Sequence, residues 1–370
     1  RCRRRRTKVK SSPTNNGRGP RILVGMSGGV DSSVAALLLL EAGYDVSGIT
    51  MRLKPRHILS GEQAAAMERE IADAAAVCAK LGIAHFAPDF SAAFEKNVIG
   101  AFISAYSAGE TPNPCFLCNQ TIKFGVMLDW ALENGFDKIA TGHYAEIALE
   151  NGRALLKRSP DKKDQSYFLS GLTPAQLSRT VIPLNRMGKA EARALAERHG
   201  LPVAKKPDSQ EICFIPDNNY ISFLERFGGS LPGPGNFVSP DGAVLGRHGG
   251  IYRYTIGHRK GLGVTFGEPR FVTGIDSVKN TVTLGRDGDR YTTEVRLRAL
   301  NLIAADALEG PVWVEAKVRY AAKPDRALLT PAGANTARLV FDTPQRAVTP
   351  GQVAALYTGD YVLGSGIITR

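Results

Sequence analysis

The sequence predicts an α/β domain with a parallel sheet, followed by smaller β-rich domains. Short apolar runs alternate with helical stretches over residues 21–150, which is typical of a parallel sheet with helices on both faces. Helical periodicity almost disappears after Gly228, where short strands alternate with Gly, Asp and Asn turns. At 370 residues the chain is long enough for two or three domains.

The individual elements follow from these runs. The predicted strands of the first domain are Arg21–Val24, Asp45–Met51, Ala84–Phe86 and Lys138–Thr141, and its predicted helices are Ser33–Ala42, Ala64–Leu81, Phe94–Ala108 and Ile122–Asn134. After the Gly- and Pro-rich joint at residues 229–235, representative strands are Val244–Leu245, Thr281–Leu284, Val312–Arg319, Ala337–Phe341 and Val353–Thr358. We therefore expect an α/β domain over residues 21–227, a small central β-rich domain over 228–290 and a β-barrel over 291–370.

Most of the net charge of +12 lies at the N-terminus. Residues 1–20 contain eight Lys or Arg and no acidic residue, which leaves 39 basic and 35 acidic residues elsewhere. We expect this tail to be disordered, and a nucleic-acid arm, the remnant of an organellar transit peptide or a misread start would each explain it. No apolar run approaches the roughly 18 residues of a membrane span, so no membrane partner is expected. Five cysteines without a secretory signal predict a reducing compartment, the cytoplasm first and an organelle as the alternative.

A glycine- and serine-rich loop joins the first strand to the first helix. Its backbone can approach an anion closely, and the helix N-terminus behind it offers free N–H groups. Asp31 is suited either to orient Mg²⁺ or to cap the helix. The loop lacks the Gly-Lys-Ser/Thr ending of a Walker loop and is similar to the pyrophosphatase loop of ATP-dependent adenylating enzymes. Its residues are Gly25, Met26, Ser27, Gly28, Gly29, Val30, Asp31 and Ser32.

Three cysteines form the second signal. Cys115 and Cys118 make a Cys-x-x-Cys pair, expected on a proline-rich loop just before a helix whose dipole lowers the pKa of a thiol. Cys213 follows about a hundred residues later. A zinc site, a thioredoxin-like pair and sulfur transfer all remain open, although a second Cys-x-x-Cys for zinc is missing. Cys78 lies in an alanine-rich helical pattern and is expected to be buried.

Several motifs occur in order along the chain, and together they resemble the tRNA-specific 2-thiouridylase family from Arg21 to Arg370. They are SGGVDSS, TPNPCxxCN, residues 140–144 (ATGHY), residues 163–169 (KDQSYFL), residues 208–215 (DSQEICFI) and residues 254–263 (YTIGHRKGLG). The resemblance implies an ATP-pyrophosphatase domain, a central domain and a C-terminal β-barrel. It also implies an enzyme that replaces the oxygen on carbon 2 of the tRNA wobble uridine by sulfur. ATP would adenylate that oxygen, because an adenylate leaves far more easily than a carbonyl oxygen.

The resemblance also assigns roles to residues. ATP with Mg²⁺ would bind the loop from Gly25 to Ser32, with Met51 and Gly142 beside the adenine. Cys118 would be the nucleophile and Cys213 the persulfide carrier, with a transient disulfide between them. The target base would face Asn113, Pro114 and Cys115. Other tRNA contacts would come from His143, Lys163, Asp164, Gln165, Arg319, Tyr320 and Gln352. Implied partners are tRNAs of the Lys, Glu and Gln type and a persulfide protein or a relay from a cysteine desulfurase.

One departure from the family pattern keeps a second mechanism open. Many members carry Asp where this chain has Cys115, and three thiols brought close together would suit an iron–sulfur cluster with one open iron. Cys115, Cys118 and Cys213 are therefore also candidate cluster ligands, with the cluster-free persulfide mechanism slightly favoured. Two further alternatives are an adenylating ligase or amidotransferase that uses the same loop and a non-enzymatic RNA-binding protein.

Overall fold

The first domain contains the parallel sheet that the sequence predicts. The structure is a computed structural model that describes residues 19–207, 212–215, 217–265 and 267–370, so the tail up to residue 18 and Asp208 lie outside it. The strands are β1 (Arg21–Gly25), β2 (Asp45–Ile49), β3 (Ala84–Phe86), β4 (Lys138–Ala140) and β7 (Thr180–Val181), and their order is β3-β2-β1-β4-β7. All pairings between them are parallel. The strand order reverses between β1 and β4, and ligands of such sheets bind at this point.

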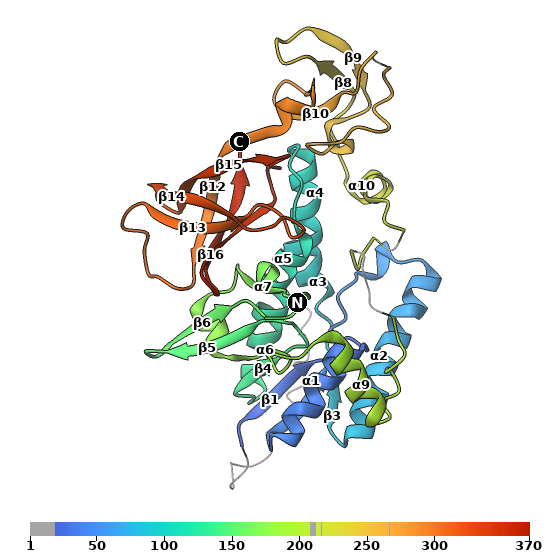
Figure 1. Cartoon of the computed structure of the whole chain (residues 1–370). Helices are drawn as coiled ribbons and strands as arrows, with labels where there is room; N and C mark the ends of the chain where they lie inside the picture. The colour runs from blue at the N-terminus through green and yellow to red at the C-terminus, as the bar shows by residue number, and fades with distance from the viewer. Residues whose placement is uncertain (1–18, 208–211, 216, 266) are drawn as a thin grey trace, which may run out of the picture.

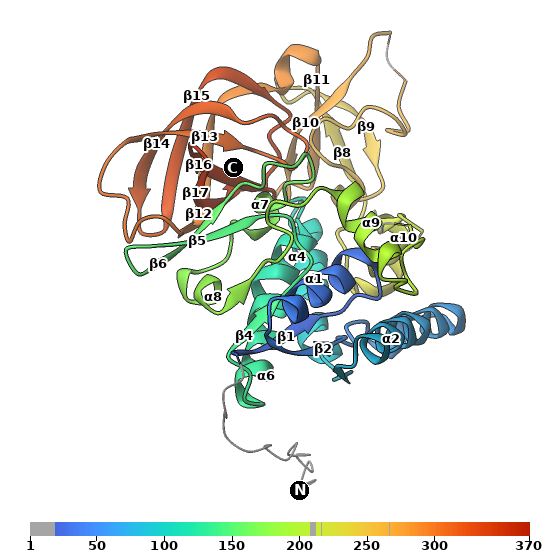
Figure 2. The same ribbon diagram turned by 60° about the horizontal axis from the view of Figure 1, so that its bottom comes forward.

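Helices cover both faces of this sheet (Figures 1 and 2). The α-helices of the described residues are α1 (Val30–Glu41), α2 (Gly61–Leu81), α3 (Ser91–Phe94), α4 (Gly100–Ser107), α5 (Pro114–Cys118), α6 (Met127–Glu133), α7 (Ser166–Leu169), α8 (Pro174–Ser178), α9 (Lys189–Arg198) and α10 (Tyr220–Phe227), of which α10 lies away from the sheet. Short 3₁₀ turns are η1 (Arg56–Ile58), η4 (Ile251–Arg253) and η5 (Asp287–Arg290), and π-helical stretches are η2 (Glu95–Ile99) and η3 (Asn119–Val126). Helix α1 is apolar around most of its circumference, which is typical of a helix that is buried against a sheet.

The cysteine pair lies inside a helix, and the expectation of a loop before the helix is wrong. Asn113 is the N-cap and accepts a hydrogen bond from the N–H of Phe116 at 3.0 Å, while Pro114 occupies the first helical position. Proline is tolerated there because its missing N–H has no partner in the first turn. The helix therefore begins about eight residues before the predicted start at Ile122 and runs on through η3 into α6.

The rest of the chain forms a small β domain and a closed barrel. The central strands β8 (Gly235–Val238), β9 (Val244–His248), β10 (Phe271–Asp276) and β11 (Thr281–Gly285) pair in the order β10-β11-β8-β9. The barrel strands are β12 (Tyr291–Leu302), β13 (Val312–Lys317), β14 (Asp325–Gly333), β15 (Thr336–Arg346), β16 (Val353–Thr358) and β17 (Tyr361–Thr369). They follow one another as β12-β15-β14-β13-β16-β17, and β17 pairs back with β12 to close the barrel. The predicted fold class is confirmed.

A hairpin of the first domain joins the barrel, which the sequence did not predict. Strands β5 (Glu146–Glu150) and β6 (Arg153–Lys157) pair with each other, and Lys157 of β6 pairs with Tyr361 of β17. Figure 2 shows the hairpin lying along the barrel strands. The barrel strands and this hairpin of the first domain therefore form one continuous sheet, which is separate from the parallel sheet.

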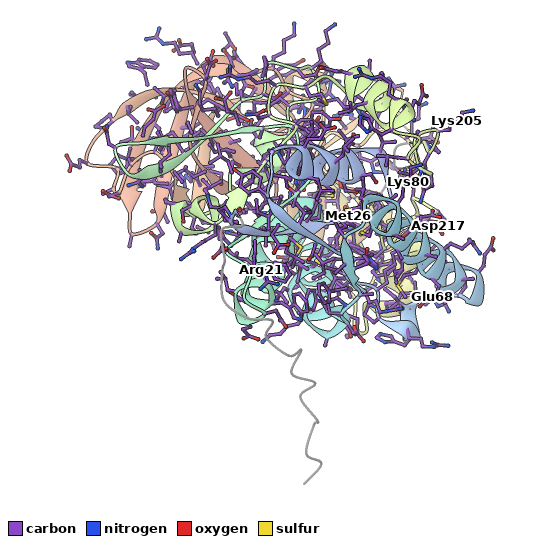
Figure 3. All side chains as sticks on the ribbon, turned by 90° about the horizontal axis from the view of Figure 1, so that it is seen from below. Arg21, Met26, Glu68, Lys80, Lys205 and Asp217 are labelled. Atoms are coloured by element: carbon purple, nitrogen blue, oxygen red, sulfur yellow. The ribbon has the colours of Figure 1, made fainter. Side chains whose placement is uncertain are left out.

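Hydrophobic clusters hold the first domain together around the sheet. One of them contains β1, β2 and α1 side chains together with Met26. In Figure 3 Met26 lies nearer the middle of the molecule than the labelled residues Glu68, Lys205 and Asp217. Over the described part of the chain, no helix combines the length and the apolar character needed to cross a bilayer.

Candidate active site

The Ser/Gly loop lies where the strand order reverses, between β1 and the start of α1. Ser27 donates its backbone N–H to the Ser32 hydroxyl at 3.2 Å, and that hydroxyl donates to the Gly29 carbonyl at 3.2 Å. Gly29 is the N-cap of α1 and no side-chain cap covers the helix start among the described residues. The first N–H groups of α1 are thus available to an anion, and phosphate binds at such helix starts.

Two glycines let this loop fit between its neighbours. Gly28 has a φ of +66°, and a Cβ atom there would lie 2.7 Å from the Glu70 carbonyl oxygen in α2. Gly142, just after β4, lies directly on the start of α1: a Cβ atom at this residue would lie 2.6 Å from the carbonyl carbon of Asp31 and 2.7 Å from the N of Ser32. The structure thus brings Gly142 against the loop; its role beside the adenine stays a prediction.

Asp31 has two partners that the sequence did not indicate. Its Oδ1 accepts hydrogen bonds from the Tyr144 hydroxyl at 2.7 Å and from the Lys189 ammonium at 2.6 Å. The carboxylate therefore faces the first residues after β4 and the start of α9 and does not cap α1. Lys189 brings a positive charge to the edge of the anion-binding loop, and nothing in its local sequence connects it with a loop about 160 residues earlier.

Three of the candidate ATP-binding residues are partly or wholly used in packing. Met26 and Val30 are 2% and 3% exposed, so only their backbone atoms are available to a ligand. Met51 is half-buried and packs against two hydrophobic clusters, one containing Phe116 and the other containing Cys118. Met51 thus lies between the sheet and the cysteine helix.

The cysteines of the site come together from two segments. Cys118 is 8% exposed and packs in the same cluster as Phe214 and Ile215, the residues that follow Cys213. Cys115 and Cys213 are exposed residues, and all four cysteines of the described residues are free thiols. Burial is the main cause that raises the pKa of Cys118 to about 12; the Lys123 charge opposes it, and the neighbouring Cys213 and Cys115 add to it. Each of these thiols thus lies within electrostatic reach of the others.

Lys123 is a cation that acts on all three thiols, and sequence reasoning missed it. It lies in the π-helical stretch η3 directly after Cys118, and π-helical segments are frequent at functional sites. Desolvation by the surrounding protein atoms is the main cause that raises the pKa of the Cys115 and Cys213 thiols; the Lys123 charge opposes it at both, and the Lys54 charge also opposes it at Cys213. The signal that was available is a lysine about one turn beyond a reactive cysteine. A nearby cation stabilises the thiolate, which is the nucleophilic form.

Replacing Lys123 by methionine is expected to raise the pKa of Cys115 and to slow its alkylation by iodoacetamide at pH 8. A rise of one pKa unit reduces the thiolate fraction, and with it the rate, by up to about tenfold. The measurement is the pH profile of alkylation, followed by peptide mass spectrometry. Lys54→Met is the matched control, because Lys54 lowers the pKa of Cys213 and is not among the causes acting on Cys115. Equal Cys115 profiles in wild type and Lys123→Met would contradict the role of this lysine.

His143 is held in a neutral form beside the same cluster. Its Nδ1 lies 2.8 Å from the Thr141 hydroxyl, and its ring lies 5.8 Å from that of Phe124. Burial, and to a smaller extent the charge of Lys123, lowers the pKa of His143 well below its ordinary value. A neutral imidazole hydrogen-bonds but does not attract a phosphate as a cation would.

The segment from Lys163 to Gln165 is organised by its own hydrogen bonds. The Asp164 carboxylate accepts from the N–H of Ser159 at 2.9 Å and from the hydroxyl of Ser166 at 2.7 Å. Gln165 accepts from the N–H of Tyr144 at 3.0 Å through its side chain. The Lys163 N–H is bonded to Asp161 at 2.8 Å. Asp164 and Gln165 therefore shape the loop whether or not they also touch RNA.

Barrel residues meet this segment at an aromatic cluster. Tyr320 is 41% exposed, and its ring lies 4.6 Å from that of Phe168, which comes just after Gln165. Asn113 hydrogen-bonds to Tyr167, whose hydroxyl donates to the Val353 carbonyl at 3.0 Å. Arg319 donates to the Arg346 carbonyl at 2.7 Å. The candidate RNA-binding residues of the first domain and of the barrel thus lie around one region next to the cysteine helix.

The arrangement of the described side chains bears on the metal hypothesis. Among the residues that the structure describes, no three His, Cys, Asp or Glu side chains are grouped so as to hold one metal ion. The described thiols are therefore not arranged as a ready cluster site, and we derive no step through an iron–sulfur cluster.

A parallel sheet with a Ser/Gly loop at its switch point and no Walker lysine defines the class of PP-loop ATP pyrophosphatases. Comparison with known proteins places the chain within this class. Residues 20–217 match the family described as "tRNA methyl transferase HUP domain", residues 221–286 its PRC-barrel domain, and residues 292–368 the "Aminomethyltransferase beta-barrel domain". The chain belongs to the tRNA-specific 2-thiouridylase family.

Its relatives match over nearly their whole length. The tRNA-specific 2-thiouridylase MnmA of Acetivibrio thermocellus is 47% identical, over 94% of this chain and 99% of the relative. That of Clostridioides difficile is 45% identical, over 95% and 98%. Among solved structures, a predicted subunit of tRNA methyltransferase from Methanocaldococcus jannaschii is 18% identical, covers 48% of this chain and 74% of that chain, and has a TM-score of 0.32. A similarity at that level carries no argument about function.

Proposed function

We propose that the protein is a tRNA-uridine 2-sulfurtransferase that uses ATP to replace the oxygen on carbon 2 of the wobble uridine by sulfur. The observation that carries this proposal is the packing of Cys118 against Phe214 and Ile215, which brings the segment of Cys213 to the helix of Cys115 and Cys118 in a PP-loop domain. Relatives at 47% and 45% identity are named 2-thiouridylases, which supports it. The description of the first matched domain speaks of a methyl transferase, but coupled thiols are the chemistry of sulfur transfer.

ATP activates the uridine oxygen in the first step. The N–H groups at the start of α1 and the hydroxyls of Ser27 and Ser32 bind the phosphates, and Gly142 lets the end of β4 lie directly against the start of α1. The Lys189 ammonium adds positive charge near Asp31. When bound, Mg²⁺ would neutralise charge on the leaving pyrophosphate. The phosphates would hold most of it, because the Asp31 carboxylate is already paired through Oδ1.

Sulfur transfer then uses the two cysteines in different roles. A persulfide on Cys213 attacks carbon 2 through its terminal sulfur, and AMP leaves with the former uridine oxygen. The Cys118 thiolate next attacks the Sγ of Cys213, which breaks the S–S bond and leaves the terminal sulfur on the uridine. The two thiols supply the two electrons that reduce this sulfur and end as a Cys118–Cys213 disulfide. A dithiol reductant and a persulfide donor then restore the starting state.

The RNA face of the proposal combines both domains. We infer that the uridine enters beside Asn113, Pro114 and Cys115, with His143, Arg319 and Tyr320 around it. Tyr320 offers an exposed ring on which a base can stack. An anticodon loop is single-stranded, so its bases can be turned out into such a site. tRNAs of the Lys, Glu and Gln type, a persulfide protein or desulfurase relay as the donor, and a cytoplasmic location remain predictions.

The direct test is incubation of the protein with ATP, Mg²⁺, unmodified tRNA and a protein persulfide donor, followed by nucleoside mass spectrometry. We expect 2-thiouridine at position 34, with one AMP and one pyrophosphate released per sulfur. Release of AMP without any thiolated nucleoside would favour a ligase or amidotransferase instead.

Cys115→Asp decides between the persulfide mechanism and a cluster. In the persulfide scheme we expect the variant to keep activity within about threefold, because Cys115 adjoins the base and does not carry sulfur. Anaerobically prepared wild type should contain no stoichiometric iron or acid-labile sulfide after reconstitution. Iron bound by the wild type and lost, together with activity, in Cys115→Asp would instead make Cys115 a cluster ligand.

A further inference from the structure

The segment from Ala108 to Pro112, which leads into the cysteine helix, is held by other domains. It links the end of α4 at Ser107 to the N-cap residue Asn113. In Figure 1 the C-terminus of the chain lies beside the upper end of α4, with the barrel on one side. We call this stretch, residues 108–112, the approach segment.

The barrel makes several polar contacts to the approach segment. Gln352 donates its side-chain amide to the carbonyls of Thr111 at 2.9 Å and Pro112 at 3.2 Å. The Pro350 carbonyl accepts from the Thr111 N–H at 2.8 Å. Arg298 forms an ion pair with Glu110 at 2.7 Å. The barrel thus contacts consecutive residues up to the one before Asn113.

The C-terminal residue and the central domain also contact the approach segment. The Arg370 guanidinium donates to the carbonyls of Ala108 and Gly109, both at 3.1 Å. The hydroxyls of Thr111 and Thr255 are 3.1 Å apart. A Cβ atom on Gly351 would lie 2.9 Å from the Thr111 nitrogen, so the two backbones touch at this point. The start of the cysteine helix is therefore attached to two other domains.

The amide of Gln352 has little left for RNA. Both N–H groups of its side chain are directed at carbonyl acceptors, and only this orientation of the amide fits two carbonyls. The remaining Oε1 can only accept a hydrogen bond, so it cannot bind a phosphate oxygen. The resemblance implies that Gln352 contacts tRNA. Such a contact would have to be a hydrogen bond that Oε1 of Gln352 accepts from an N–H or hydroxyl group of the RNA.

We propose that Gln352 is a positioning residue. Through its hydrogen bonds to the approach segment, this barrel residue fixes the position of the start of the cysteine helix before any tRNA binds. The contacted carbonyls lie one and two residues before Asn113, whose side chain caps the helix carrying Cys115 and Cys118. The position of the barrel relative to the approach segment is thereby coupled to the burial of Cys118. The consequence for thiolation rests on the proposed function, but the coupling itself is a property of the tRNA-free protein.

The test is the alkylation rate of each cysteine in tRNA-free protein, wild type against Gln352→Glu. Glutamate has nearly the same shape, but its carboxylate lacks both donors and is repelled by the two carbonyls. Loosening the helix start exposes Cys118, and a fall of one unit in its pKa raises its iodoacetamide rate by about tenfold. The thermal unfolding midpoint is measured alongside. If Gln352→Glu does not fold, Gln352→Asn serves instead, because its shorter side chain keeps the amide but loses reach.

Two controls give the result its meaning. Arg326→Ala removes a barrel-surface side chain that packs over Trp313, away from the approach segment, and should leave all alkylation rates unchanged. Arg338→Ala removes a barrel-surface ion pair with Glu294 and should likewise leave all alkylation rates unchanged. Cys118 alkylation in Gln352→Glu at the wild-type rate, with only tRNA binding weakened, would overturn the proposal. Because this readout uses the protein alone, it is independent of whether 2-thiouridine is formed.

Discussion

Cys118→Ser is expected to lower 2-thiouridine formation by at least about a thousandfold, because a hydroxyl cannot attack the persulfide and release the transferred sulfur. Cys118 is the buried thiol of the cluster, and burial with its neighbours raises its pKa to about 12 in the free protein. It must therefore be deprotonated during the reaction, with Lys123 as the cation that favours this. Pyrophosphate and AMP should each be released only once per enzyme, since adenylation and the Cys213 persulfide attack precede the Cys118 step and the uridine then stays attached to Cys213.

The measurement is nucleoside mass spectrometry beside an AMP assay. Cys78→Ala is the matched control, because Cys78 is fully buried behind Gly48 and lies outside the cluster of three thiols. That variant should keep thiolation at nearly the wild-type rate. Unchanged thiolation in Cys118→Ser would remove the sulfur-transfer role and return the chain to the ligase or amidotransferase alternative.

Gly142→Ala is expected to reduce ATP affinity by at least about tenfold and to destabilise the fold by about 1–3 kcal/mol, as overpacking does. The added methyl group would lie within 3.0 Å of three backbone atoms of Asp31 and Ser32. Backbone cannot move aside as a flexible side chain does, so the start of α1 must shift and its N–H groups lose their alignment.

Isothermal titration with ATP and thermal unfolding test this expectation. Gly61→Ala is the control, because a Cβ atom at Gly61 meets nothing within 4 Å. ATP binding by Gly142→Ala at wild-type affinity would mean that the nucleotide does not use the start of α1.

The parallel sheet and its loop were predictable because they depend on local signals. Strand β3 has the predicted bounds, and β1, β2 and β4 differ from them by one or two residues. The position of Gly142 at the neighbouring strand end follows from the same parallel arrangement. The start of the cysteine helix was also readable, since Asn113 followed by Pro114 is a typical N-cap and first position. The expectation of a loop at this position was wrong because proline is common in loops as well as at the first position of a helix.

The rest depends on contacts between residues that are far apart in sequence. Lys189 reaches Asp31 across 158 positions, and Gln352 reaches Thr111 across 241. The pairing of β6 with β17 is equally remote. No periodicity or local propensity carries this information, because such contacts appear only once the domains have packed. Sequence resemblance named several of these residues, but not what they touch.

The shared sheet has a consequence for how the chain is made on the ribosome. Strand β6 ends at Lys157, whereas its partner β17 begins at Tyr361, roughly 200 residues later. At about 5–20 residues per second, the outer edge of β6 waits on the order of 10–40 s for its partner to be synthesised. An unpaired strand edge recruits other strands during that time. The nascent protein therefore passes through an aggregation-prone interval, which chaperones that bind exposed edges would shorten or shield.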